Sequence, residues 1–68
     1  MIWHMFTLKP FLGKPGRVQR NDGAIFTLSF SESTTLWSLE PEGLEPTGEL
    51  YDDLTICDVL NTDSFKKV

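Results

Sequence analysis

Cys57 and His4 are the only residues of their types in this chain of 68 residues. A cysteine nucleophile needs a base within hydrogen-bond reach, a group that orients the base and a cleft for the substrate. Cys57 lies in an apolar run, which is typical of a buried structural thiol. His4 is flanked by Trp3 and Met5, where it suits a strand position better than proton transfer. We therefore do not expect this pair to be catalytic.

The spacing of the acidic residues and glycines does not match the common metal and nucleotide sites. A helix-loop-helix calcium loop has acids at alternating positions, a central glycine and a closing glutamate, whereas residues 52–63 contain no glycine. The glycines of residues 13–23 lack the spacing and the strand-to-helix context of a phosphate-binding loop. We therefore expect no metal, no cofactor and no enzymatic activity.

The single cysteine and the apolar N-terminus indicate where the protein is located. One cysteine cannot form an intramolecular disulfide or a cysteine-based zinc site, and a chain without disulfides fits the reducing cytoplasm. Residues 1–6 are apolar but lack a basic leader, a long apolar stretch and a small-residue cleavage site. We therefore expect a cytoplasmic protein with neither a signal peptide nor a membrane-spanning segment, and no membrane partner.

Charge is unevenly distributed along the chain. Residues 1–23 contain four basic residues and one acid, a net charge of +3, whereas residues 24–68 contain two basic residues and nine acids, a net charge of −7. An acidic surface repels nucleic acid and membrane phosphates and attracts basic surfaces. The simplest reason for the formal net charge of −4 is that it keeps a small domain soluble.

Two sets of residues are candidates for binding a macromolecule. The first set would contact a protein partner and comprises Trp3, Met5, Glu45, Glu49, Asp52 and Asp53. As an alternative, these acids imitate a row of phosphates and occupy the basic groove of a nucleic-acid-binding protein. The second set would hold a nucleic-acid backbone weakly and comprises Lys14, Arg17 and Arg20. Because acids outnumber bases, a nucleic-acid partner is the less favoured of these expectations.

The elements that would position these residues are mainly strands. Residues 2–8 have apolar side chains on both sides of an extended segment, which at a sheet edge could add to the sheet of a partner or of a second copy in a homodimer. Lys9-Pro10 ends this strand, because proline donates no ladder hydrogen bond. Residues 18–20 and 24–30 flank Asn21-Asp22-Gly23, the sequence of a three-residue hairpin loop.

The next residues predict a turn at 31–33 and a strand at 34–39. Alternation in residues 24–30 places Ala24, Phe26, Leu28 and Phe30 on one face of the sheet, and Ile25, Thr27 and Ser29 on the other. The main predicted core residues are Phe26, Leu28, Phe30, Trp37 and Leu39.

The C-terminal half is less regular. Residues 39–50 contain a tandem Leu-Glu-Pro-x-Gly repeat, which predicts turns within an extended acidic connector on the surface. The β-branched residues of 50–61 favour a strand; the alternative is a helix capped by Asp52, with Leu50, Leu54 and Cys57 on one face. Residues 61–68 are expected to be a mobile or loosely docked tail.

These features predict one small β-rich domain over residues 1–60. We expect a mainly β fold, a small antiparallel sheet or partly open barrel of about four or five strands, with α+β as the alternative if residues 50–61 form a helix. A chain of this size buries only about 60% of the surface that its unfolded form exposes, so few apolar residues remain to enclose a substrate. We therefore expect a non-enzymatic, acidic interaction module, a regulator or accessory protein that binds another protein.

Overall fold

The computed structural model describes residues 8–68. The predicted strand at 2–8 lies outside the described residues except for Leu8, which is half-buried just before a short 3₁₀ helix. Trp3, His4 and Met5 also lie outside the described residues. The predictions for them are therefore not addressed by the structure.

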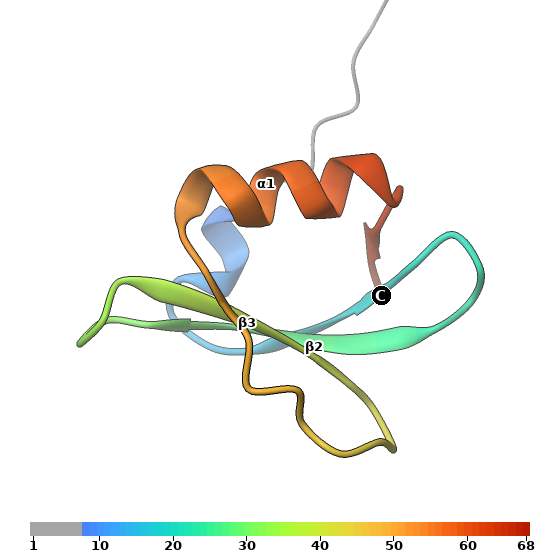
Figure 1. The fold of residues 1–68 in the computed structure, drawn as a ribbon. Helices are drawn as coiled ribbons and strands as arrows, with labels where there is room; N and C mark the ends of the chain where they lie inside the picture. The colour runs from blue at the N-terminus through green and yellow to red at the C-terminus, as the bar shows by residue number, and fades with distance from the viewer. Residues whose placement is uncertain (1–7) are drawn as a thin grey trace, which may run out of the picture.

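The described chain forms a five-stranded antiparallel sheet with one α-helix across one of its faces (Figure 1). This confirms the predicted mainly β fold with a small antiparallel sheet. The strands are arranged in the order β4-β3-β2-β1-β5, so that every pair except β1–β5 consists of neighbours in the sequence. In chain order the elements are η1 (Lys9–Phe11), β1 (Gly16–Gln19), β2 (Ile25–Ser31), β3 (Leu36–Pro41), β4 (Leu50–Tyr51), α1 (Asp53–Thr62) and β5 (Lys66–Lys67).

The hairpin between β1 and β2 forms where it was predicted. Gln19 pairs with Ile25, and the Arg20 N–H donates a hydrogen bond to the Ala24 carbonyl at 2.8 Å. Inside this bridge the Gly23 N–H donates to the Arg20 carbonyl at 2.9 Å. Gly23 has a φ of +96°, a conformation that glycine adopts without steric cost, which explains why this residue closes the loop.

The face of the sheet that meets α1 forms the core. Pairing of β2 with β3 places Leu28 beside Leu39 and Phe30 beside Trp37. As predicted, Leu28, Leu39 and Trp37 are buried, while Phe26 and Phe30 are partly buried against them. The core residues among residues 8–68 are Phe11, Val18, Leu28, Trp37, Leu39, Ile56, Leu60 and Phe65.

One glycine allows the N-terminal 3₁₀ helix to close this core. A Cβ atom added at Gly16 would lie 2.5 Å from Cε2 of Phe11. The ring of Phe11, which is 2% exposed, therefore packs directly over the β1 backbone at a position where any side chain would collide with it.

Residues 53–62 form a helix, so the favoured prediction of a strand over 50–61 is wrong and the helical alternative is correct. Asp52 caps the helix by accepting a hydrogen bond from the Thr55 N–H at 2.8 Å. The face predicted for that helix is also wrong, because Ile56 and Leu60 are buried whereas Leu54 is 84% exposed. A capped turn and burial of two apolar residues one helical turn apart outweigh the local strand preference of the β-branched residues.

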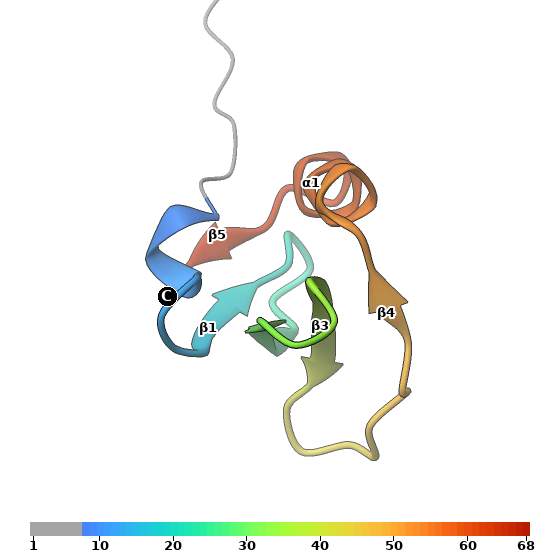
Figure 2. The ribbon, with the colours of Figure 1, turned by 90° about the vertical axis from the view of Figure 1, so that its left-hand side faces the viewer.

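The predicted C-terminal tail is part of the fold. Asn61 and Thr62 complete α1, and the buried ring of Phe65 contacts Phe26 edge to face, with 5.4 Å between centroids. Lys66–Lys67 then pairs with β1, and the Val68 N–H donates to the Arg17 carbonyl at 3.1 Å. Figure 2 shows this last strand beside β1, on the side of the sheet away from β4.

Candidate functional site

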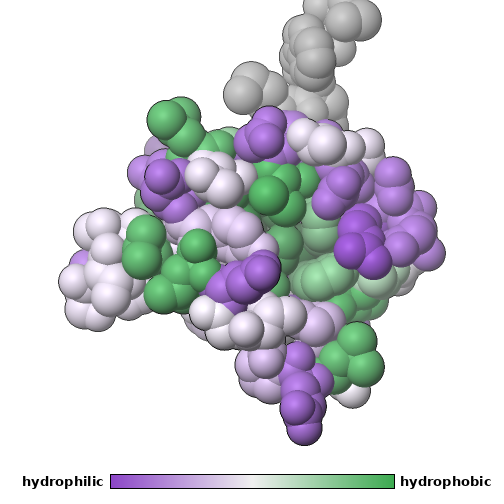
Figure 3. Space-filling view, in the orientation of Figure 1, coloured by the Kyte–Doolittle hydropathy of each residue, from purple (hydrophilic) through white to green (hydrophobic). Residues whose placement is uncertain are grey.

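The acidic candidates are located on the connector between β3 and β4 and at the start of α1. We call this region, residues 44–54, the acidic surface. It displays three leucines among its acids: Leu44 is 72% exposed, Leu50 57% and Leu54 84%. Figure 3 shows hydrophobic surface beside hydrophilic surface over both the start of α1 and the connector below the sheet. Three leucines exposed within eleven residues of chain supply apolar area that a partner could cover.

The connector has a defined path because one side chain of β3 holds it. Glu40 accepts hydrogen bonds from the Thr47 N–H at 2.7 Å, the Thr47 hydroxyl at 3.1 Å and the Gly48 N–H at 3.2 Å. These donors, led by the Thr47 N–H, lower the pKa of Glu40. The two repeat units of the sequence therefore have different structures, since Pro41 belongs to β3 whereas Pro46 lies in the exposed connector.

Three of the four predicted acidic contacts also stabilise the fold. Asp52 caps α1, and the hydrogen bond from the Thr55 N–H lowers the pKa of its carboxyl. Asp53 accepts a hydrogen bond from Nε1 of the buried Trp37 at 2.8 Å. Glu49 accepts from the Tyr51 hydroxyl at 2.9 Å, which raises the pKa of Tyr51.

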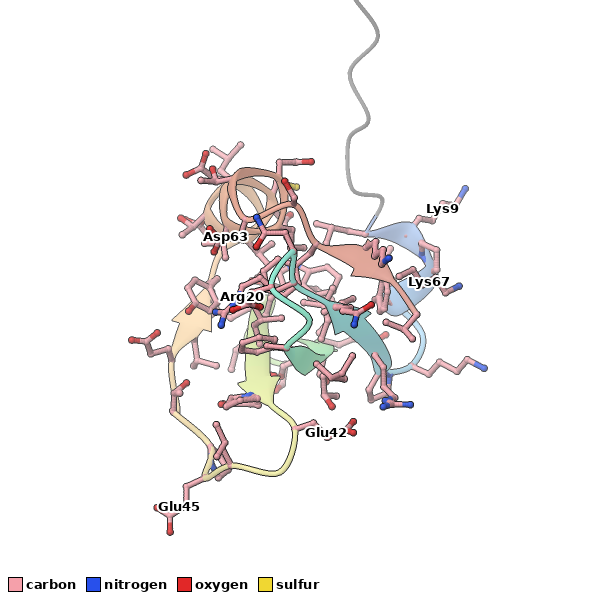
Figure 4. The ribbon with its side chains drawn as sticks, turned by 90° about the vertical axis from the view of Figure 1, so that its right-hand side faces the viewer. Lys9, Arg20, Glu42, Glu45, Asp63 and Lys67 are labelled. Atoms are coloured by element: carbon pink, nitrogen blue, oxygen red, sulfur yellow. The ribbon has the colours of Figure 1, made fainter. Side chains whose placement is uncertain are left out.

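Glu45 has no such structural role. It is exposed and makes no hydrogen bond or ion pair with another residue of the described part of the chain. Figure 4 shows it projecting from the tip of the connector. Of the four acids, Glu45 is therefore the one whose position is explained by no contact within the fold.

Two of the lysines lie on the side of the molecule away from the tip of the connector. In Figure 4, Lys9 and Lys67 project from the side formed by η1 and β5, and Glu45 projects from the other. Because β5 pairs with β1, the two lysines at the end of the chain join the basic N-terminal third. Lys66 and Lys67 thus lie beside the strand that contains Arg17.

The three residues predicted for nucleic acid differ in their surroundings. Arg17 is bound by Glu42 through two hydrogen bonds of 2.9 and 3.0 Å. Arg20 is bound in the same way by Asp22, at 3.1 and 2.9 Å, which lowers the pKa of Asp22. Lys14 is exposed and has no hydrogen bond or ion pair to residues 8–68. Two of the three cations therefore already have carboxylate partners.

Other chemistry is not assembled in the part of the chain that the structure describes. Cys57 is a free, half-buried thiol on α1. Among residues 8–68 no three histidine, cysteine or acidic side chains converge to bind a metal ion. Within the same range, no helix has the length and apolar character to cross a membrane.

The exposed leucines were not among the predicted binding residues. The sequence does contain a pattern that could have indicated them. The repeat and the residues after it place leucines directly beside glutamates and aspartates, in a segment with turn residues. Nothing in that pattern distinguishes Leu39, which is buried, from Leu44, which is exposed. That difference depends on where β3 ends, at Pro41.

The comparisons with known proteins add no assignment: no protein-family model, no curated protein and no solved structure matches this chain.

Proposed function

We propose that this protein is a non-enzymatic module that binds another protein through its acidic surface. The observation that carries the proposal is the exposure of Leu44, Leu50 and Leu54 beside Glu45, Glu49 and Asp53. Such a surface matches a partner that presents apolar side chains within a basic patch. Burying the leucines would supply affinity, and the acids would attract and orient the partner.

The same observation separates this function from phosphate mimicry. Phosphates along a nucleic acid provide charge but no aliphatic side chains, so a protein that imitates them gains nothing from exposed leucines. In a protein-binding surface, by contrast, apolar anchors contribute most of the affinity and surrounding charges contribute specificity and association rate. The exposed leucines therefore favour a protein partner that is recognised by apolar contact as well as by charge.

The experiment compares capture of proteins from the source cells by four variants and the wild type. The Leu44→Ser/Leu54→Ser variant removes two anchors, and Glu45→Gln/Glu49→Gln removes two charges. Leu12→Ser and Glu32→Gln are matched controls, because Leu12 is 46% exposed near η1 and Glu32 is exposed in the β2–β3 turn, both outside the acidic surface. A specific partner should be retained by both controls and by the wild type.

Affinity is then measured with the purified partner. We expect the leucine variant to bind about tenfold or more weakly, because each buried leucine contributes on the order of 1 kcal/mol. Loss of binding with the charge variant alone, together with displacement of the partner by DNA, would support phosphate mimicry instead. Equal binding by all five proteins would refute the proposed surface.

A further inference from the structure

A second surface of the molecule combines lysines with exposed apolar side chains. It lies where η1 meets β5 and consists of Lys9, Leu12, Lys67 and Val68, which we call the basic edge. Leu12 is 46% exposed and Val68 61%. Neither lysine forms an ion pair with any residue of the described range 8–68. The basic edge therefore presents positive charge and apolar area together.

Contacts through one aromatic ring bring these residues together. Phe11 of η1 is buried in the core, and the Leu12 N–H beside it donates to the Lys9 carbonyl at 3.2 Å. Nζ of Lys67 lies 5.9 Å from the centroid of the Phe11 ring. Val68 follows Lys67 in the chain, and its N–H donates a hydrogen bond to the β1 backbone. These contacts place η1 beside β5, at the edge of the sheet.

The basic edge and the acidic surface belong to opposite edges of the sheet. β5 is the strand at one edge, and β4, which lies within the acidic surface, is the strand at the other. Figure 4 shows Lys9 and Lys67 projecting from one side of the molecule and Glu45 projecting from the other. One copy of the folded chain therefore cannot bring its own two surfaces into contact, whereas two copies can.

We infer that the partner of the acidic surface is the basic edge of a second copy of this chain. This inference rests on the proposed function, because it uses the acidic surface as one half of the contact. That surface matches a partner with apolar side chains within a basic patch, and Leu12 and Val68 beside Lys9 and Lys67 form such a patch. Opposite charges would orient the two copies, and burial of apolar side chains would supply the affinity.

The contact joins two unlike surfaces, so the copies associate head to tail. A pair formed in this way still has a free acidic surface at one end and a free basic edge at the other, so association can continue beyond two copies. The net charge of −4 on each copy opposes association. However, the radius of gyration of one copy is 11.5 Å, so the centres of two touching copies are further apart than the screening length of about 10 Å at 0.1 M salt. We therefore expect weak association that increases with protein concentration.

The test mixes two variants that each lack one of the two surfaces. Leu44→Ser/Leu54→Ser removes apolar anchors of the acidic surface, and Leu12→Ser/Lys67→Gln removes an anchor and a charge of the basic edge. All four side chains are exposed, so both variants should fold. In sedimentation equilibrium at about 0.1 M salt, the average mass of the wild type should rise with concentration, while each variant alone should remain a single copy. An equimolar mixture should form a complex of two copies and nothing larger.

Isotope labelling of one variant at a time identifies the surfaces that meet in the mixture. When the variant with the altered acidic surface is labelled, amide chemical shifts should change at residues 9–12 and 66–68. When the variant with the altered basic edge is labelled instead, they should change at residues 44–54. The two sets of shifts together would show that one copy contributes each surface.

Two lysines of the same strand provide a matched control. Lys66 and Lys67 are both exposed in β5, but successive side chains of a strand point to opposite faces, and only Lys67 lies over Phe11. We expect Lys67→Gln to weaken the self-association of the wild type about threefold or more, and Lys66→Gln less than about twofold. Equal weakening by the two variants would show only general charge attraction and would contradict the basic edge as the binding surface.

Three results would overturn the inference. The first is a wild type that remains a single copy at every concentration, and the second is a mixture with no complex of its two components. The third is self-association that persists in both variants, which would mean that the copies meet through other surfaces. The capture of a different protein through the acidic surface does not depend on a second copy, so it would support the proposed function even if this inference failed.

Discussion

At the scale of single residues, acids of the same type have different roles. Asp52 and Asp53 are adjacent, yet one caps the helix backbone and the other accepts from a buried indole sixteen residues earlier in the chain. The capping role was predicted only as part of the helical alternative, and it depends only on residues next to Asp52. The bond between Asp53 and Trp37 was not predicted, since it depends on how α1 packs on β3.

The Trp37–Asp53 hydrogen bond predicts a difference between two substitutions. Asp53→Ala would leave a buried N–H without an acceptor and should lower the free energy of unfolding by about 1–3 kcal/mol. Asp53→Asn removes the same charge but keeps an oxygen acceptor, so we expect a cost of less than half of that. Urea unfolding followed by far-ultraviolet circular dichroism measures both values. Equal costs would show that the charge at the first turn of α1 matters and that the hydrogen bond does not.

The Asp52 cap predicts how stability depends on pH. The hydrogen bond from Thr55 lowers the pKa of Asp52 in the folded state, so the unfolded chain binds this proton more tightly. The contribution is complete above the ordinary aspartate pKa of about 4 and is lost as the pH falls through the lowered value. Asp52→Asn keeps a cap but does not titrate, so its unfolding free energy should depend less on pH between about 5 and 2.

Part of that pH dependence should remain in the Asp52→Asn variant. The pKa values of Asp22 and Glu40 are also lowered, by Arg20 and by the Thr47 N–H respectively. Identical pH profiles for the variant and the wild type would contradict the role assigned to the cap. The test needs only denaturant unfolding at several pH values.

At the scale of elements, the sequence was informative where neighbouring residues decide the structure. The loop Asn21-Asp22-Gly23 and the alternation in β2 depend on local chemistry, and both were predicted correctly. The segment 53–62 was misjudged because its β-branched residues favour a strand locally, while its burial against the sheet requires a helix. The prediction for residues 61–68 was wrong because the stabilising contact of Phe65 is made with Phe26, which is far away in the sequence.

The docking of the C-terminal residues predicts a large effect of Phe65→Ala. Phe65 is 8% exposed, and removing such a ring from a core costs about 3–5 kcal/mol. That is a large part of the stability of a domain of this size, for which about 0.05–0.15 kcal/mol per residue is usual. We expect the thermal transition of the variant to move far below that of the wild type or to disappear.

Two further variants keep this prediction measurable. Phe65→Leu retains most of the apolar volume and should remain folded with a clearly reduced transition temperature. Val68→Ala alters an exposed side chain of the same segment and should change the unfolding free energy by no more than about 0.5 kcal/mol. If Phe65→Ala were as mild as Val68→Ala, residues 61–68 would be the loosely attached tail that the sequence first indicated.

At the scale of the whole molecule, the fold changes which charged residues of the sequence lie near one another. Charge counting along the chain separated residues 1–23 from the rest but left Lys66 and Lys67 on the acidic part. The pairing of β5 with β1 brings these two lysines to the basic side, which a linear count cannot reveal. Lys66 and Lys67 therefore lie at the edge of the sheet opposite β4, beside a strand of the N-terminal third.

This separation predicts that short charged peptides bind opposite sides of the protein. At low salt, an oligolysine should shift the amide signals of residues 42–58, which include the acidic surface, and an oligoglutamate should shift those of residues 9–20 and 64–68. Both effects should fade as the ionic strength rises, because the screening length falls from about 30 Å at 0.01 M to about 3 Å at 1 M. Glu45→Gln/Glu49→Gln should weaken the response to oligolysine and leave that to oligoglutamate unchanged. Overlapping shift patterns for the two peptides would mean that only the net charge of the protein matters. The acidic surface would then not direct a partner to one side of the molecule.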